Sequence, residues 1–368
     1  MDFTFTAEQD DAAKLAAQII GDHTSPARMT EVENAGDRFD RDLWRALADA
    51  GLLSLQLPEE HGGAGLGLIE LCRVLVEAGR RVAPVPLAVH GATSALLAEA
   101  GSPEQQAAWL PRAASGESVL TAAVAEERSQ LPTRPATEAR RSGDAWTLHG
   151  TKAIVRAGTV ASAYLVTATA AGEGTGVFLV ESGAAGLGVV PQRTSDRDAV
   201  ARLDLDGVPA TLVGTLDGST ASRLGQLLTV ATAAELLGVT EGALKLTSAY
   251  ARTREQFERP IGTFQAVSQR LADGYIDVLG QRLVLWSAVW RLVEGLPAEV
   301  EVASAKLWAA DAAHRLAHTT VHIHGGVGID LDGEAHRYFT AAKRFEFAFG
   351  SATEQALAIG RVLAAEPV

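Results

Sequence analysis

The stretch from Tyr250 to Gln265, YARTREQFERPIGTFQ, constrains the fold most, because it interrupts two long runs of residues with helical spacing. Tyr250 and Arg254 are four residues apart and would share one face of a helix, with Phe257 one turn further along. Pro260 is expected to close that helix, since proline cannot continue a helical hydrogen-bond ladder. Apolar positions then resume at helical spacing. The stretch therefore predicts a helix, a tight turn and a second helix.

Three regions of different texture follow one another along the chain. Residues 1–118 are rich in Ala, Leu and Glu at helical spacing. Residues 119–214 change to short β-branched runs such as AYLVTATA and GVFLVES, which predict an antiparallel β-barrel or sandwich. Residues 215–368 return to long helical segments, for which a four-helix bundle is the natural arrangement. The expected fold is α+β with these three domains.

Composition and charge exclude several classes of protein. The formal net charge of −13 argues against nucleic acid or an anionic membrane as the main partner, since both attract basic surfaces. The single cysteine, Cys72, excludes an intramolecular disulfide framework. His61 has no second ligand at metal spacing, so no metal site is predicted. The acidic start, MDFTFTAEQDD, is unlike a signal peptide, and no strongly apolar run is long enough to span a bilayer, so we expect a cytoplasmic protein.

Taken together, the motif Y-x-x-x-R-x-Q-F-x-x-P-I-x-x-F-Q and the downstream HIHGGVGID resemble the carboxy-terminal domain of the acyl-CoA dehydrogenases. The amino-terminal loop LPEEHGGAGL is similar to the P-E-x-x-G-G-x-G segment of the same family. The resemblance covers nearly the whole chain. It implies a helical domain, a β-domain and a helical bundle, with FAD as the cofactor, an acyl-CoA as the substrate and electron-transfer flavoprotein as the electron acceptor.

The resemblance also implies roles for single residues. In the family, an Arg and a Gln of the hairpin and the backbone of the Gly-Gly-x-Gly turn reach across a dimer interface to the FAD of a neighbouring subunit. The corresponding positions here, with the neighbouring aromatic residue, are Arg254, Phe257, Gln265, Gly325, Gly326 and Gly328. A guanidinium suits a pyrophosphate, and glycines let backbone N–H groups approach a ligand closely.

The position of the family's catalytic base is not occupied by an acid. Removing the α-proton of the thioester needs a carboxylate, which most members carry in Y-E-G-T-N-E-x-Q. The corresponding segment here is EFAFGSATEQ, which puts Phe349 at that position. A minority of the family places the base on an earlier helix, and that position is Leu228, with Thr229 where a nearby Arg is expected. Glu235 and Glu346 are the remaining weak candidates.

The β-domain also departs from the family. Where flavin-binding members have T-E-P-G-x-G-S-D, this chain has AEERSQLPTR from Ala125 to Arg134, and only Glu126 matches. The following K-x-x-I-T-N-G reads KAIVRAG. We therefore expect the chain's own β-domain to hold flavin poorly or not at all.

Three hypotheses remain. In the first, the chain is the degenerate subunit of a heterotetramer and completes the FAD site of a second acyl-CoA dehydrogenase-like chain, which brings the base. In the second, it is a self-sufficient homotetrameric flavoenzyme with a relocated base. In the third, it is a helical scaffold without flavin. The acyl group and the partner chain cannot be named from the sequence.

Overall fold

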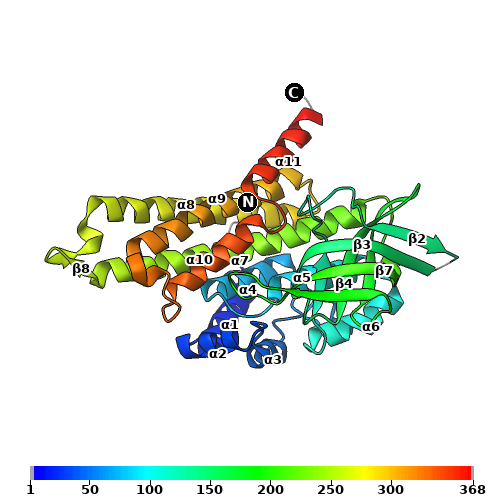
Figure 1. Cartoon of the computed structure of the whole chain (residues 1–368), viewed down its shortest axis with the longest axis horizontal. Coiled ribbons are helices and arrows are strands. Elements are labelled where there is room, and N and C mark those ends of the chain that lie inside the picture. Colours follow the sequence, from blue (N-terminus) through cyan, green and yellow to red (C-terminus); the bar gives the residue numbers. More distant parts are fainter. Residues whose placement is uncertain (1–3, 144, 366–368) are drawn as a thin grey trace. The chain divides into compact units, whose positions relative to one another are not determined.

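The computed structural model describes residues 4–143 and 145–365, and Figure 1 shows the order of the elements. The chain forms two compact units. The carboxy-terminal unit comprises the residues from Thr232 onward together with the residues up to Thr30 and the segment Cys72–Ala83. The other unit comprises Glu31–Leu71 and Pro84–Ala231. The division into three domains at residues 118 and 214 stays a prediction.

Helices make up both ends of the chain, as the spacing of apolar residues predicted. The helices before the strands are α1 (Ala7–His23), α2 (Pro26–Asn34), α3 (Arg41–Asp49), α4 (Leu68–Arg80), α5 (Leu87–Ala100) and α6 (Pro103–Ala114). Those after the strands are α7 (Ser219–Thr253), α8 (Gln265–Val293), α9 (Glu299–His324), α10 (Ala335–Phe347) and α11 (Ala352–Ala365). Three short 3₁₀ turns are η1 (Glu59–His61), η2 (Ile261–Thr263) and η3 (Gly325–Gly328).

Between these helical regions lies the predicted β-region. Its strands are β1 (Leu120–Ala123), β2 (Glu138–Ser142), β3 (Ala145–Arg156), β4 (Ala163–Ala170), β5 (Gly174–Glu181), β6 (Leu187–Gln192) and β7 (Val200–Val213). They pair in the order β1-β4-β2-β3-β7-β5, and a further pairing of β4 with β5 closes a ring of five strands. Outside this ring, β1 pairs with β4 and β6 pairs with β7. The region is therefore a small closed barrel rather than an open sandwich.

The barrel is not wholly antiparallel, which corrects the prediction. β1 and β2 both run parallel to β4, because the long loop between β1 and β2 carries the chain back to the starting end. Its interior is filled by alternate residues of the strands, among them Trp146, Leu148, Tyr164 and Phe178. This packed interior explains the β-branched and aromatic runs seen in the sequence.

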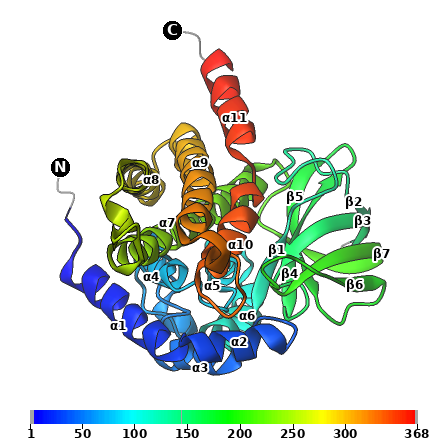
Figure 2. The same ribbon diagram turned by 60° about the vertical axis from the view of Figure 1, so that its left-hand side comes forward.

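In the carboxy-terminal unit, α9 is the element on which the other helices pack. It contacts α8, α10 and α11, and Figure 2 shows these three helices around it. Alanine dominates the buried positions of α9, including Ala309, Ala310, Ala312 and Ala313. Small side chains let neighbouring helices approach closely. The predicted helical carboxy-terminal domain is confirmed.

Glycines bring α4 and α7 into backbone contact. A Cβ atom on Gly79 of α4 would lie 1.9 Å from the carbonyl oxygen of Glu235. A Cβ atom on Gly238 of α7 would lie 2.0 Å from the carbonyl oxygen of Val76. One turn later, a Cβ atom on Gly242 would lie 2.5 Å from an atom of the Tyr338 ring. No other residue type fits these crossings without moving the helices.

A partly buried carboxylate joins three helices beside this crossing. Glu241 of α7 accepts a hydrogen bond from Arg80 of α4 (Nε to Oε2, 2.5 Å) and another from Arg282 of α8 (2.5 Å). The Tyr338 hydroxyl of α10 donates to the carbonyl oxygen of Arg80 at 2.8 Å. These polar contacts thus hold the helices in the same relative position that the glycines allow.

Helix α7 corrects one expectation from the sequence. It contains a window with a mean hydropathy of 1.4, so by length and composition it could span a membrane. In the folded chain, 89% of that window is buried. Its apolar character is therefore explained by packing inside the protein.

We predict that Gly238→Ala destabilises the chain. The new methyl group would overlap the Val76 carbonyl, and such overpacking costs about 3 kcal/mol. Gly360→Ala is the matched control, because Gly360 lies in α11 and a Cβ atom added to it would meet no other atom within 4 Å. Urea unfolding followed by circular dichroism should show a lower midpoint for Gly238→Ala and an unchanged or higher midpoint for Gly360→Ala. Equal midpoints would contradict the close crossing.

Candidate functional site

The two sequence motifs meet at one end of the carboxy-terminal unit. The ring of Tyr250, near the end of α7, stacks on the ring of His324, the last residue of α9, with centroids 4.3 Å apart and planes 21° apart. His324 Nδ1 is 2.8 Å from the carbonyl oxygen of Thr320. Burial lowers the pKa of His324, which favours the neutral imidazole in this stack. The stack therefore connects the end of α7, which leads into the hairpin, with the end of α9, which leads into the glycine turn η3.

The hairpin differs from the predicted helix. Helix α7 ends at Thr253. Two short strands, β8 (Glu255–Gln256) and β9 (Arg259–Pro260), then pair as an antiparallel ribbon. The two residues between them, Phe257 and Glu258, have φ angles of 54° and 63°. Such a two-residue turn suits a β-hairpin and cannot be part of a helix. The prediction that the helix continues past Phe257 and is closed by Pro260 was therefore wrong.

Arg254 and Gln265 stand at the two ends of this connection, and both side chains are exposed. The backbone carbonyl of Arg254 accepts a hydrogen bond from Ile261 N at 2.8 Å, which fixes the connection. In the part of the chain that the structure describes, neither the Arg254 guanidinium nor the Gln265 amide has a side-chain partner. Phe257 is 86% exposed. These groups are available to a ligand or to another chain.

The three glycines of η3 meet different constraints. Gly325 has φ 64° and ψ −140°, a backbone conformation that favours glycine. A Cβ atom on Gly328 would lie 2.9 Å from the Val321 carbonyl oxygen, so packing within the chain requires glycine there. Apart from the chain neighbours of Gly326, no atom of the described residues lies within 4 Å of a Cβ position there. Gly326 leaves its backbone open to a close approach from outside.

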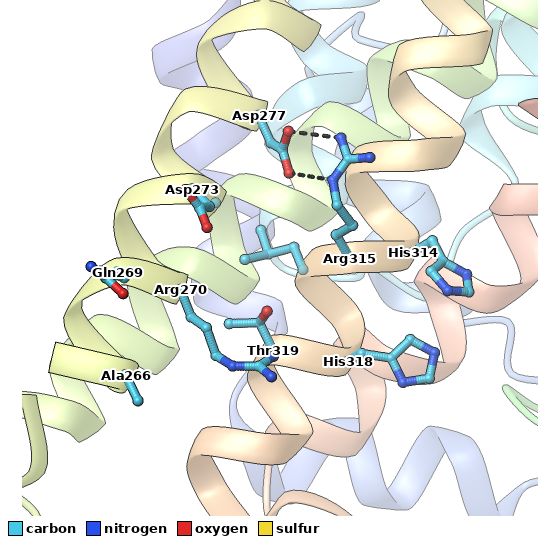
Figure 3. Close-up of a pocket in the computed structure, with 11 residues that line it drawn as sticks. Ala266, Gln269, Arg270, Asp273, Asp277, His314, Arg315, His318 and Thr319 are labelled. Carbon is cyan, nitrogen blue, oxygen red and sulfur yellow. Dashed lines mark hydrogen bonds and ion pairs between the residues drawn. The ribbon is translucent and has the colours of Figure 1, made fainter. Parts of the chain in front are cut away.

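A groove runs between α8 and α9, beginning one residue after Gln265 (Figure 3). Its volume is about 600 Å³. Its polar lining includes Arg270, Asp273, His318 and Thr319. Arg315 is held by Asp277 through a bidentate pair of 2.7 and 2.9 Å, which raises the pKa of Arg315 further above its ordinary value. Within the described residues Arg270 has no such acidic partner, so it can offer its charge to the groove.

The segment predicted to correspond to the family's base position, EFAFGSATEQ, begins in the last turn of α10 and runs into α11. Phe349 is buried, with φ 56°, and is followed by Gly350 with φ 109°. The nearby Glu346 is held by Lys343, at 2.6 Å from Nζ to Oε2, and lies 3.0 Å from His314 Nδ1. A carboxylate bound to an ammonium group is not a free proton acceptor.

The other candidate position lies on α7. Leu228 and Thr229 are buried, and the Thr229 hydroxyl donates to the Gly225 carbonyl within the same helix at 2.7 Å. Glu235 is only 4% exposed and sits at the crossing of α4 and α7. Its part in catalysis stays a hypothesis.

In the barrel, Glu126 organises the loop that differs from the flavin-binding sequence. Lys152, fully buried, donates from Nζ to Glu126 Oε1 at 2.7 Å. The backbone N–H groups of Ala136 and Thr137 donate to the same carboxylate at 2.6 and 3.0 Å. Burial lowers the pKa of Lys152 to about 8, against the opposing effect of Glu126. The carboxylate thus ties both ends of the loop to the barrel.

The altered strand segment KAIVRAG is also internally paired. Arg156 donates from Nε to Asp198 Oδ2 at 3.3 Å, and both side chains are 10% exposed. Ile154 is 48% exposed. Where the family pattern has a short hydroxyl side chain, this chain therefore has a guanidinium already engaged with a carboxylate.

Reasoning from the sequence missed Lys306 of α9, which is completely buried and donates to the carbonyl oxygens of Glu346 and Gly350. A signal was present, because Lys306 is the only cation in the apolar run VASAKLWAA. The groove at Arg270 was also missed, since spacing alone does not show which helix faces lie open.

Comparison with known proteins shows a full-length relationship. Residues 6–117 match the amino-terminal domain of acyl-CoA dehydrogenases, and residues 228–364 match their carboxy-terminal domain. The chain is 45% identical to acyl-CoA dehydrogenase FadE27 of Mycobacterium tuberculosis, with 100% of both chains covered. It is similar to a chain of the ChsE4-ChsE5 complex from Mycobacterium tuberculosis (TM-score 0.95, 45% identity, 100% of both chains). It is also similar to a chain of the Tcur3481-Tcur3483 steroid ACAD (TM-score 0.93, 40% identity, 97% of this chain and 98% of that one).

We predict that Glu126→Gln loosens the loop and lowers the free energy of unfolding by about 2 kcal/mol, because Lys152 loses its carboxylate. Burial opposes ionisation of Glu126, but Lys152 and the backbone donors prevail, so its pKa is lowered. Its stabilising effect should be present above about pH 4.3 and lost as the pH falls through the lower folded pKa.

Unfolding measured at pH 7 and at several lower pH values checks this prediction. The acid-induced loss of stability should be smaller in Glu126→Gln than in the wild type. The control is Glu127→Gln, because the neighbouring Glu127 is exposed. If both variants unfold like the wild type at every pH, Glu126 does not organise the loop.

Proposed function

The chain belongs to the acyl-CoA dehydrogenase family, and we propose that it is a subunit that completes the FAD site of an unlike partner chain. In this proposal the complex introduces a double bond between the α and β carbons of an acyl-CoA thioester. The partner brings the catalytic base and most of the flavin contacts. This chain brings Arg254, Gln265 and the open backbone at Gly326.

The observation that carries the proposal is a contrast within the chain. The side chains of Arg254 and Gln265 are exposed and have no side-chain partner in the described part of the chain, and Gly326 has no described atom within 4 Å of a Cβ position. Neither base position, Phe349 nor Leu228, carries an acid. Groups suited to binding a pyrophosphate are retained, while the group needed for proton removal is absent.

The residues fit FAD at one place and not at another. At the carboxy-terminal edge, Arg254 and Gln265 would hold the pyrophosphate, and the groove beginning beside Gln265 supports binding of the adenosine half near Arg270. In the barrel, Arg156 stands where the family pattern has a hydroxyl residue, and its Nε is paired with Asp198, so this position does not fit the family's flavin contact. When bound, FAD accepts the hydride that leaves the β carbon. Arg254 would neutralise phosphate charge and orient the cofactor.

The surface of α8 supports association with another chain. Its exposed apolar residues follow a helical spacing on one side of the helix, namely Tyr275, Ile276, Leu279, Leu283, Trp290 and Val293. A continuous apolar stripe of this length is typical of a protein interface. The name of the ChsE4-ChsE5 complex states that a relative assembles with a second chain. We extend that arrangement to this chain as a heterotetramer.

Further features are proposed by analogy. A relative is named as a steroid ACAD, so we propose a CoA thioester with a bulky, steroid-sized acyl group. Electron-transfer flavoprotein is proposed as the acceptor, and the cytoplasm as the compartment. The alternative of a self-sufficient enzyme would need Glu235 as its base, and the burial of Glu235 at the α4–α7 crossing does not favour it. A flavin-free scaffold would leave the unpaired Arg254 without a use.

The FAD content of the purified chain tests the proposal. Expressed alone, the chain should retain little FAD after gel filtration, because its barrel departs from the flavin-binding sequence of the family. Co-expressed with an unlike acyl-CoA dehydrogenase chain, it should elute as a complex with about one FAD per pair of chains. One FAD per chain when expressed alone, bleached by acyl-CoA, would overturn the subunit proposal.

The cross-chain contribution is tested in that complex by Arg254→Gln. Loss of a charge-assisted bond to pyrophosphate should weaken FAD retention by about 10-fold or more. The matched control is Arg252→Gln, because Arg252 is exposed in the last turn of α7 and belongs to no proposed contact. Assembly should be unchanged in both variants. Equal FAD retention in both would exclude a role for Arg254 in binding the cofactor.

A further inference from the structure

Lys306 connects the middle of α9 to the segment that follows α10. Its side chain is completely buried, and Nζ donates to the carbonyl oxygen of Glu346 at 3.1 Å and to that of Gly350 at 2.8 Å. These two carbonyls lie on either side of Phe349. A single side chain thus holds both ends of the turn that carries the family's base position.

The held turn has an unfavourable backbone. Phe349 has φ 56°, a region that non-glycine residues seldom adopt, and such conformations persist only where surrounding contacts impose them. Within the turn, Gly350 N donates to the Phe347 carbonyl at 3.1 Å, and Gln355 donates from its side chain to the Phe349 carbonyl at 3.0 Å. Together with these local bonds, Lys306 ties the turn to α9.

Helix α11 follows directly after the same turn and packs on α9. None of its residues, Ala352–Ala365, is buried, so its side chains add little to the core. Its first turn is capped by Glu354, which accepts hydrogen bonds from the backbone and hydroxyl of Ser351. The position at which α11 begins is therefore fixed by the segment that precedes it, while its length packs on α9.

We propose that Lys306 is a positioning residue that fixes the turn around Phe349 and, through it, the start of α11. The inference does not depend on the proposed cofactor role. It gives the fully buried amine of Lys306 a structural role.

The hold on the turn requires hydrogen-bond donors and not a positive charge. Burial lowers the pKa of Lys306 to about 7, although Glu354 and Glu346, which face it from α11 and α10, act in the opposite direction. Glu346 is itself bound to Lys343 and lies beside His314. A neutral amine still has two N–H groups, one for each carbonyl. The turn should therefore stay closed on both sides of neutral pH.

The test is amide hydrogen exchange of the full chain, corrected for intrinsic rates. In Lys306→Met, which keeps the length and removes the donors, exchange at Gly350 and in the first turn of α11 should rise by about 10-fold or more. Amides in the buried middle of α8 serve as the internal reference and should not change. Lys306→Arg retains two donors and should restore much of the protection.

The pH dependence separates this proposal from a purely electrostatic one. The wild type should protect Gly350 equally at pH 6 and pH 8.5 after correction. Protection lost at pH 8.5 would overturn the donor mechanism. Unchanged exchange in Lys306→Met would overturn the positioning role, and so would equal loss in Lys306→Met and Lys306→Arg with the α8 reference intact. If Lys306→Met unfolds globally, Lys306→Arg and the wild-type pH comparison still decide.

Discussion

The crossing of α4 and α7 is the contact on which the carboxy-terminal unit depends. Gly79 and Gly238 let two backbones touch, and Gly242 admits the Tyr338 ring one turn later. The carboxylate of Glu241 then binds Arg80 and Arg282 from two other helices. Because α7 ends in the motif that carries Arg254, the position of that guanidinium follows from how closely α7 can pack against α4.

The charged side chains of the barrel and the charged side chain of Arg254 are used in different ways. In the barrel, Glu126 and Lys152 neutralise each other, as do Arg156 and Asp198, so these charges are used for the internal structure. At the end of α7, the charge on Arg254 is not used internally within the described residues. A buried pair needs its partner to offset desolvation, whereas an exposed guanidinium remains free to bind an anion.

Most of the fold could be predicted from spacing, since helical and alternating patterns report burial directly. The barrel's parallel pairings could not, because register between distant strands leaves no local signal. The end of α7 was misplaced because the turn at Phe257 and Glu258 lacks the glycine or asparagine that usually marks it. Lys306 was overlooked because a lysine is seldom buried, and its carbonyl partners lie 40 and 44 residues away.

The empty surroundings of Gly326 separate two kinds of constraint on one turn. Gly325 and Gly328 are bound by the chain's own geometry, so replacing either would be felt during folding. No contact within the described chain requires glycine at position 326. Whether a side chain is tolerated at position 326 is therefore decided by the molecule that binds there. A variant at this position would fold normally and still lose function if that molecule needs the space.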